Sequence, residues 1–122
     1  MLKFTRAHDT GNHVATDEDT DITEVPVDTL DNTLAGETPA LIKIDVEGFE
    51  TEVLNGAASI LASPGLKAII IELNGAGNRY GFDDKDIHRL LLNHGFKTMQ
   101  YTPFARELKY AQLNTEHKTL YL

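Results

Sequence analysis

Two short, mainly apolar runs stand out in the pattern of the chain, at residues 40–46 and 67–73. Continuous runs of this kind, rich in Ile, Leu and Val, are typical of strands that are buried on both faces of a sheet. Residues 49–62 and 83–94, which follow these runs, place apolar side chains at helical spacing. The pattern therefore predicts buried strands that alternate with amphipathic helices.

Shorter elements complete this pattern. Gly95 lies where the second helix should end, and residues 96–101 predict a third strand. Residues 104–113 are ambiguous, and the alternation in 117–122 predicts a terminal strand. The order strand, helix, strand, helix, strand predicts the α/β class with a parallel sheet.

The N-terminal residues have a different character. Residues 1–24 are rich in Asp, Thr, Gly and Asn, so we expect a loop or irregular hairpin with a short strand at 2–5. Residues 24–30 predict an extended segment, and Pro26 places it at a sheet edge because proline has no N–H to donate. We therefore divide the chain into an acidic segment, 1–24, and an α/β domain, 25–122.

Composition limits the classes of function. The 122 residues carry a net charge of -8 and have no basic stripe, which argues against binding to nucleic acid or to anionic lipid. No apolar run approaches the ~18 residues that cross a bilayer, and the chain has no secretory leader pattern. Cysteine is absent, which excludes thiolate chemistry. We expect a cytoplasmic protein.

The stretch Leu41–Ala57, LIKIDVEGFETEVLNGA, concentrates acidic residues between the first buried strand and the first helix. Glu50 and Glu52 begin the helix, where favourable interaction with the helix dipole accounts for them. Asp45 is predicted to be the last inward residue of a buried strand, where an unpaired carboxylate is costly. Asp45, with Glu47 two residues on and on the same face, is therefore the first candidate for a site.

The second buried strand supplies neighbours for these acids. Ligands of open parallel sheets bind beyond the carboxyl ends of the strands, and Glu72 and Asn74 follow the second strand. If the two strands are adjacent, these residues lie close to Asp45 and Glu47. Such a cluster could bind a divalent cation, accept a proton from a substrate hydroxyl, or lie beside a cationic cofactor.

Other motifs carry less weight. His8, Asp9 and His13 have no established metal-ligand spacing, so we interpret them as loop residues. The chain has neither the GxGxxG pattern of a dinucleotide loop nor the GxSxG pattern of a hydrolase elbow.

Three segments taken together resemble a known family. VPVDTLDNTL at 25–34, the run KIDVEG with its following Glu at 43–50, and IIIEL at 69–73 are similar to the FkbM-type S-adenosylmethionine-dependent methyltransferases. The resemblance covers residues 22–122, more weakly toward the end. It implies a Rossmann-like class I methyltransferase fold, of which the chain would be the C-terminal βαβαβ half with a terminal strand.

The resemblance also implies a function. Family members mostly methylate hydroxyl groups of small metabolites or glycans with S-adenosylmethionine as the cofactor. Asp45 would lie near the transferred methyl group as a base or metal ligand, with Glu47 and Glu72 as catalytic partners. Asp45 and Val46 would contact the cofactor. A divalent metal ion is an alternative without a motif of its own.

One departure from the family shapes our expectations. Family members carry an Asp-x-Gly cofactor loop and a ribose-binding acid upstream of the conserved run, and we match neither to residues 1–24. We therefore expect an incomplete cofactor pocket and a chain that is inactive alone. The strand at 40–46 would lose its neighbour and become a sheet edge. We expect residues 2–5 or 24–27 to cover that edge, or two copies of the chain to pair there.

Two further hypotheses stay open. The chain could be a non-catalytic α/β module that keeps half of the fold without the activity. It could also be a hydrolase-like protein that binds a divalent metal ion through Asp45, Glu47 and Glu72.

Overall fold

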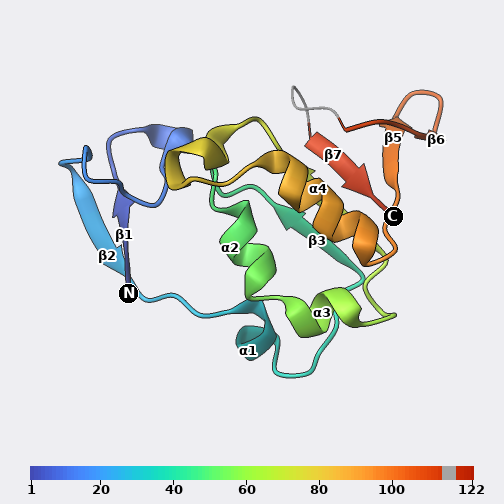
Figure 1. Ribbon diagram of the computed structural model, residues 1–122, viewed down its shortest axis with the longest axis horizontal. Coiled ribbons are helices and arrows are strands. Elements are labelled where there is room, and N and C mark those ends of the chain that lie inside the picture. The colour runs from blue at the N-terminus through green and yellow to red at the C-terminus, as the bar shows by residue number, and fades with distance from the viewer. Residues whose placement is uncertain (114–117) are drawn as a thin grey trace.

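The computed structural model describes residues 1–113 and 118–122 and contains two β-sheets (Figure 1). The small sheet pairs β1 (Leu2–Thr5) with β2 (Ile22–Val25), antiparallel. The main sheet has the order β3-β4-β7-β5-β6. Its strands are β3 (Leu41–Ile44), β4 (Ala68–Glu72), β5 (Thr98–Thr102), β6 (Glu107–Tyr110) and β7 (Lys118–Tyr121). The helices are α1 (Leu30–Leu34), α2 (Glu50–Asn55), α3 (Ala58–Ala62) and α4 (Asp84–Asn93), with 3-10 turns η1 (Asp9–Gly11) and η2 (Ala76–Tyr80).

The predicted α/β class is confirmed, but the sheet is mixed. Among the described strands only β3 and β4 pair in parallel; β7 lies antiparallel between β4 and β5, and β6 is antiparallel to β5. The ambiguous segment 104–113 contains β6. Only four residues separate it from β5, too few for the crossover that a parallel pair requires, so the two form a hairpin. The terminal strand is present at 118–121, and His117 lies outside the described residues.

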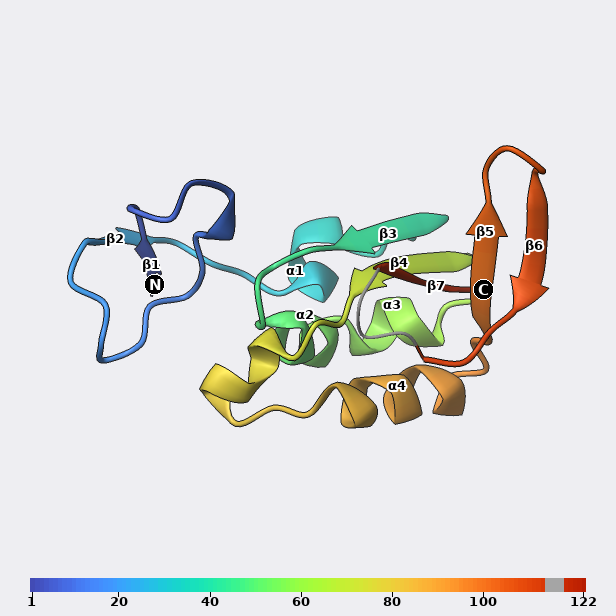
Figure 2. The same cartoon turned by 90° about the horizontal axis from the view of Figure 1, so that it is seen from above.

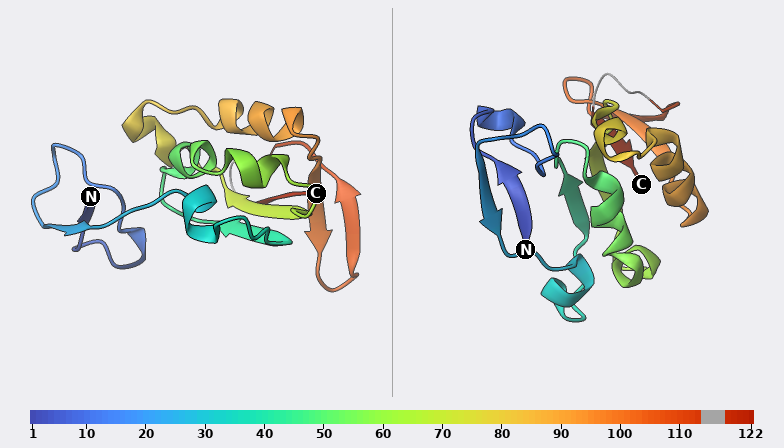
Figure 3. Two further views of the ribbon diagram at one scale, coloured as in Figure 1. Left: turned by 90° about the horizontal axis from the view of Figure 1, so that it is seen from below. Right: turned by 60° about the vertical axis from the view of Figure 1, so that its left-hand side comes forward.

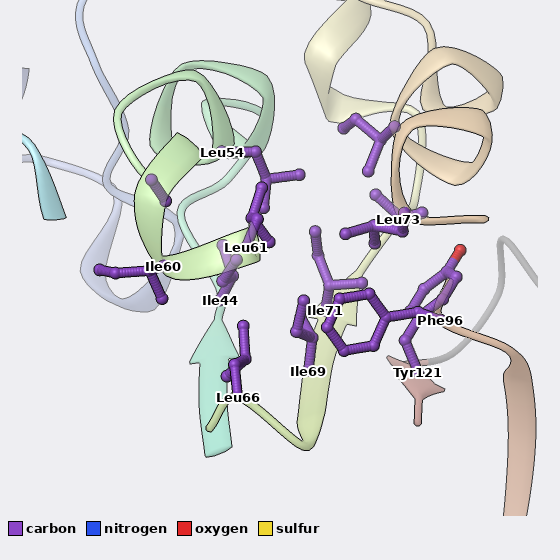
Figure 4. Close-up of a cluster of buried hydrophobic side chains, with 13 residues drawn as sticks. Ile44, Leu54, Ile60, Leu61, Leu66, Ile69, Ile71, Leu73, Phe96 and Tyr121 are labelled. Carbon is purple, nitrogen blue, oxygen red and sulfur yellow. The ribbon is translucent and has the colours of Figure 1, made fainter. Parts of the chain in front are cut away.

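The core lies between the main sheet and α2, α3 and α4, which cover one of its faces (Figure 2). Ile44, Ile69 and Ile71 point from the strands toward Leu54 and Leu61 of the helices (Figure 4). Each such side chain contributes about 1.5–3 kcal/mol by leaving water. None of the described helices is long and apolar enough to cross a membrane.

The opposite face of the sheet differs from the prediction of strands buried on both faces. Leu41 is 52% exposed, and Ile70 is half-buried. The alternation of β3 and β4 thus separates a core face from a face that no described helix covers.

The helix predicted at 49–62 is broken into α2 and α3 at Gly56. A Cβ on Gly56 would lie 3.1 Å from Cβ of Thr29, and the Gly56 carbonyl accepts a hydrogen bond from the Asp31 N–H at 3.0 Å. The close neighbour of Gly56 is therefore the segment that leads into α1, which packs against the chain where α2 ends.

Asp31 restores the hydrogen bonds that this break removes. Its carboxylate accepts the N–H groups of Ser59 at 2.9 Å and Ile60 at 3.1 Å, and so caps α3. The bond from the Ser59 N–H, supported by that of Ile60, holds the pKa of Asp31 below its usual range. Because the folded-state pKa is lowered, this stabilisation is present at neutral pH and is lost in acid, as Asp31 becomes protonated.

The outer edge of β3 has no partner strand among the described residues. The small sheet lies beyond the carboxyl end of β3 rather than beside it (Figures 1 and 2). The expectation that residues 2–5 or 24–27 cover the edge is therefore wrong. Residues 2–5 form β1, and residues 24 and 25 belong to β2. The two strands pair with one another, and α1 separates them in the chain from β3.

Pairing of two copies at this edge stays a prediction. Unpaired N–H and C=O groups on an edge strand recruit other strands, and charged side chains oppose such pairing. We expect the chain to self-associate with increasing concentration and Leu41→Lys to shift it toward monomer in light scattering coupled to gel filtration.

Leu92→Lys is the matched control, because Leu92 is 44% exposed on α4, in the helical layer. It should leave the molecular mass unchanged. A chain that stays monomeric at all concentrations would contradict the prediction.

Candidate functional site

The β3–α2 connection, residues 45–49, is a tight turn with unusual backbone angles. Glu47 and Gly48 both have positive φ, at 53° and 103°. A Cβ on Gly48 would lie 2.5 Å from the carbonyl oxygen of Ala76. Real Cβ atoms do not approach a backbone oxygen this closely, so glycine is required here for its missing side chain as well as for its φ.

Glu50 fixes this turn from the first residue of α2. Its Oε1 accepts the N–H groups of Val46 and Gly48, both at 3.2 Å, and the residue is only 4% exposed. Interaction with the helix dipole at the surface, the role expected for Glu50 from the sequence, therefore does not account for its burial and its two hydrogen bonds. The signal was the Gly-x-Glu spacing, which lets the carboxylate reach back to the N–H groups that precede the helix.

Asp45, in contrast to Glu50, is more exposed than the sequence predicted. It was predicted to point inward, but its side chain is 28% exposed and its Oδ2 lies 3.1 Å from Nζ of Lys43. β3 ends at Ile44, and Lys43 and Asp45 lie on the same side of the chain, so the carboxylate meets an ammonium group and solvent. Glu47 does not continue the strand alternation either, because the strand has ended and its own φ is positive.

Glu72 lies at the carboxyl end of β4, as predicted. Ile44 pairs with Ile71 in the parallel ladder, so the end of β3 lies beside the end of β4. Within the described ranges, no three or more His, Asp or Glu side chains form a group that could hold a metal ion. The structure thus brings the elements that carry Asp45, Glu47 and Glu72 to one edge without forming a metal centre there.

The turn also packs on the loop that follows β4. The rings of Phe49 and Tyr80 meet edge to face, with centroids 5.4 Å apart, and a Cβ on Gly77 would lie 3.4 Å from the Gly48 carbonyl oxygen. Partial burial raises the pKa of Tyr80, whose hydroxyl donates to the Val14 carbonyl at 2.6 Å. Tyr80 therefore links the turn to the N-terminal segment.

A cavity of about 640 Å³ lies between the small sheet and α2. This volume is within the range of small-molecule sites, about 300–1,000 Å³. Val46 lines it, but the three predicted catalytic acids, Asp45, Glu47 and Glu72, do not. Its lining consists of Met1, Leu2, Phe4, Val14, Val27, Asp28, Thr29, Leu30, Val46, Phe49, Glu52, Val53 and Gly56.

The N-terminal loop holds a polar cluster that sequence reasoning assigned incompletely. Nε2 of His13 lies 3.5 Å from Oδ2 of Asp19, and Nε2 of His8 lies 3.9 Å from Oδ1. Asp19 is the acid of this cluster, and the three residues interpreted as loop residues, His8, Asp9 and His13, do lie in a loop or short turn. The backbone N–H of Thr16, at 2.8 Å, holds the pKa of Asp19 below its usual value.

A second signal in this loop was overlooked. Asp9–Gly11 has the Asp-x-Gly spacing of a cofactor loop. In the structure it forms η1, which follows β1 of the small sheet and not a strand of the main sheet.

The close contact at Gly48 generates a prediction. Gly48→Ala should lower the free energy of unfolding by about 1–2 kcal/mol for the left-handed backbone, and by on the order of a further 1–3 kcal/mol for the clash with Ala76. Urea unfolding measures the sum of these two losses. Gly36→Ala is the matched control, because Gly36 also has positive φ, at 93°, but no atom near the position of its Cβ. Equal losses in the two variants would contradict the contact.

Comparison with known proteins gives one match. The family model of the methyltransferase FkbM domain matches residues 2–98, which include the small sheet, the acidic turn and both parallel strands. Neither the curated proteins nor the solved structures contain a match. The match covers most of the chain, and the chain therefore belongs to the FkbM methyltransferase domain family.

Proposed function

We propose that the chain carries part of an S-adenosylmethionine-dependent methyltransferase domain that methylates a hydroxyl group. The observation that carries this proposal is the match to the FkbM domain over residues 2–98, with the turn 45–49 at the carboxyl end of a parallel strand inside it. Ligands of open α/β sheets bind at that end. The unit β3–α2–α3–β4, with its helices on one face, supports a Rossmann-like class I fold.

The charge of the turn fits the cofactor. S-adenosylmethionine is a sulfonium cation, and the carboxylate of Asp45 is partly exposed at the end of β3. We assign Asp45 and Val46 to the cofactor, which when bound supplies an electrophilic methyl group. Val46 also lines the apolar cavity, so Asp45 and Val46 together lie where an acidic surface meets an apolar one.

The acids of this edge suit proton transfer. Asp45 would accept the proton of the acceptor hydroxyl, while the Lys43 ammonium, 3.1 Å from Oδ2, orients the carboxylate. A positioned general base contributes about 10²–10⁴-fold in rate. Glu47 and Glu72 would bind the polar groups of the acceptor and so fix its orientation.

Titration with S-adenosylmethionine, followed by the amide signals of the chain in NMR, tests the proposal. We expect weak binding that shifts the amide signals of residues 45–48. The shifts should be smaller with S-adenosylhomocysteine, which lacks the positive charge of the sulfonium group. Asp45→Asn should reduce the shifts.

Asp86→Asn is the control, because Asp86 is exposed on α4 in an ion pair with Arg89. Its titration should match that of the unmodified chain. Absence of shifts at 45–48, or equal shifts in the two variants, would contradict the proposal.

A further inference from the structure

The cavity beside the turn is bounded by two parts of the chain that are distant in sequence. β1 and the connection into α1 form one side, and α2 forms the other, as the arrangement of the small sheet and α2 in Figure 3 illustrates. Val46 and Phe49, which flank the tip of the acidic turn, both line it. The cavity therefore begins where the proposed methyl-transfer site ends.

Specific contacts hold the two sides of this cavity together. Phe49 contacts Tyr80 edge to face, and the Tyr80 hydroxyl binds the carbonyl of Val14, which also lines the cavity. Tyr80, which is partly buried, thus connects the two sides of the cavity. A ligand of the right shape would meet a preformed apolar surface.

The charged side chains that line the cavity favour some ligands over others. Apart from Thr29, its polar side chains are those of Asp28 and Glu52, and no Lys, Arg or His of the described residues lines it. The side chain of Asn32 and the N–H of Thr29 bind the Asp28 carboxylate and hold its pKa below the usual range. Asp28 is therefore ionised at neutral pH. The two carboxylates outnumber the one α-ammonium group among the lining residues, that of Met1, so an anionic ligand would meet net repulsion.

We infer that this cavity is the acceptor subsite, that it takes a mainly apolar hydroxyl compound that is neutral or cationic, and that it rejects phosphorylated and other anionic sugars. The identification of the ligand as the acceptor rests on the proposed function. The binding preference itself rests on the lining alone. Within the broad class of metabolites and glycans, the inference selects apolar alcohols and phenols.

A pair of probes that differ in charge tests this preference on the full chain. 2-Naphthol is a neutral aromatic alcohol, and 2-naphthyl phosphate has the same ring with an anionic group. We expect 2-naphthol to shift the amides of 46, 49 and 53 in NMR titration, and 2-naphthyl phosphate to bind about tenfold more weakly or less.

Two variants of the lining and one control variant localise the effect. Val53→Lys places a cation in the lining, so 2-naphthol should bind about tenfold more weakly and the phosphate should become the preferred probe. Leu92→Lys on α4, outside the cavity, is the control and should leave both affinities unchanged. Glu52→Gln, a milder change at an exposed lining residue, should reduce the discrimination between the two probes about threefold.

The outcomes separate this inference from the proposed function. Equal binding of the two probes, no binding of 2-naphthol, or shifts outside the cavity would overturn the inference, even if S-adenosylmethionine binds at 45–48. Selective 2-naphthol binding that Val53→Lys reverses would support the charge-selective cavity. If S-adenosylmethionine then fails to bind, the cavity stands and the methyltransferase proposal fails.

Discussion

The Glu50 carboxylate, which accepts the N–H groups of Val46 and Gly48, is the interaction on which the site depends. Removing a carboxylate from water is costly unless it is hydrogen-bonded, and hydrogen bonds to a charged group contribute about 1.5–3 kcal/mol. These two bonds select the left-handed conformation at Gly48 and place α2 directly after β3. The run of acids after β3 thus contains one structural carboxylate, Glu50, whose role differs from that of Asp45 and Glu47.

This fixed turn organises its neighbours. Gly48 can lie against the loop after β4 because it has no side chain, and Phe49 then reaches the Tyr80 ring. Tyr80 in turn binds Val14, which positions the N-terminal sheet over the carboxyl end of β3. Asp45 precedes Val46, which lines the cavity together with Phe49. One short backbone segment therefore carries both the partly exposed carboxylate and part of the apolar lining.

Much of the fold could be predicted from the sequence, because β3 and β4 are marked by apolar runs and α4 by the helical spacing of its apolar residues. α4 begins after the N-cap Asp83 and ends before Gly95, which has positive φ, as its local chemistry indicates. Burial in the site could not be predicted, because β3 ends at Ile44 instead of Val46. That difference of two residues exposes Asp45 to Lys43 and solvent, while the turn that follows buries Glu50. The break at Gly56 and the place of the small sheet depend on contacts between distant segments, with Thr29 and with Tyr80, which no local pattern encodes.

The most direct test compares the unfolding free energies of Glu50→Ala and Glu52→Ala. Both residues lie in the first turn of α2 and would interact similarly with its dipole, but only Glu50 is buried and bound to the turn. Urea unfolding should show a loss of about 2–3 kcal/mol for Glu50→Ala and less than about 0.5 kcal/mol for Glu52→Ala. The amides of Val46 and Gly48 should exchange faster only in the first variant. Equal losses of stability, with both amides still protected, would contradict the central role of the Glu50 carboxylate.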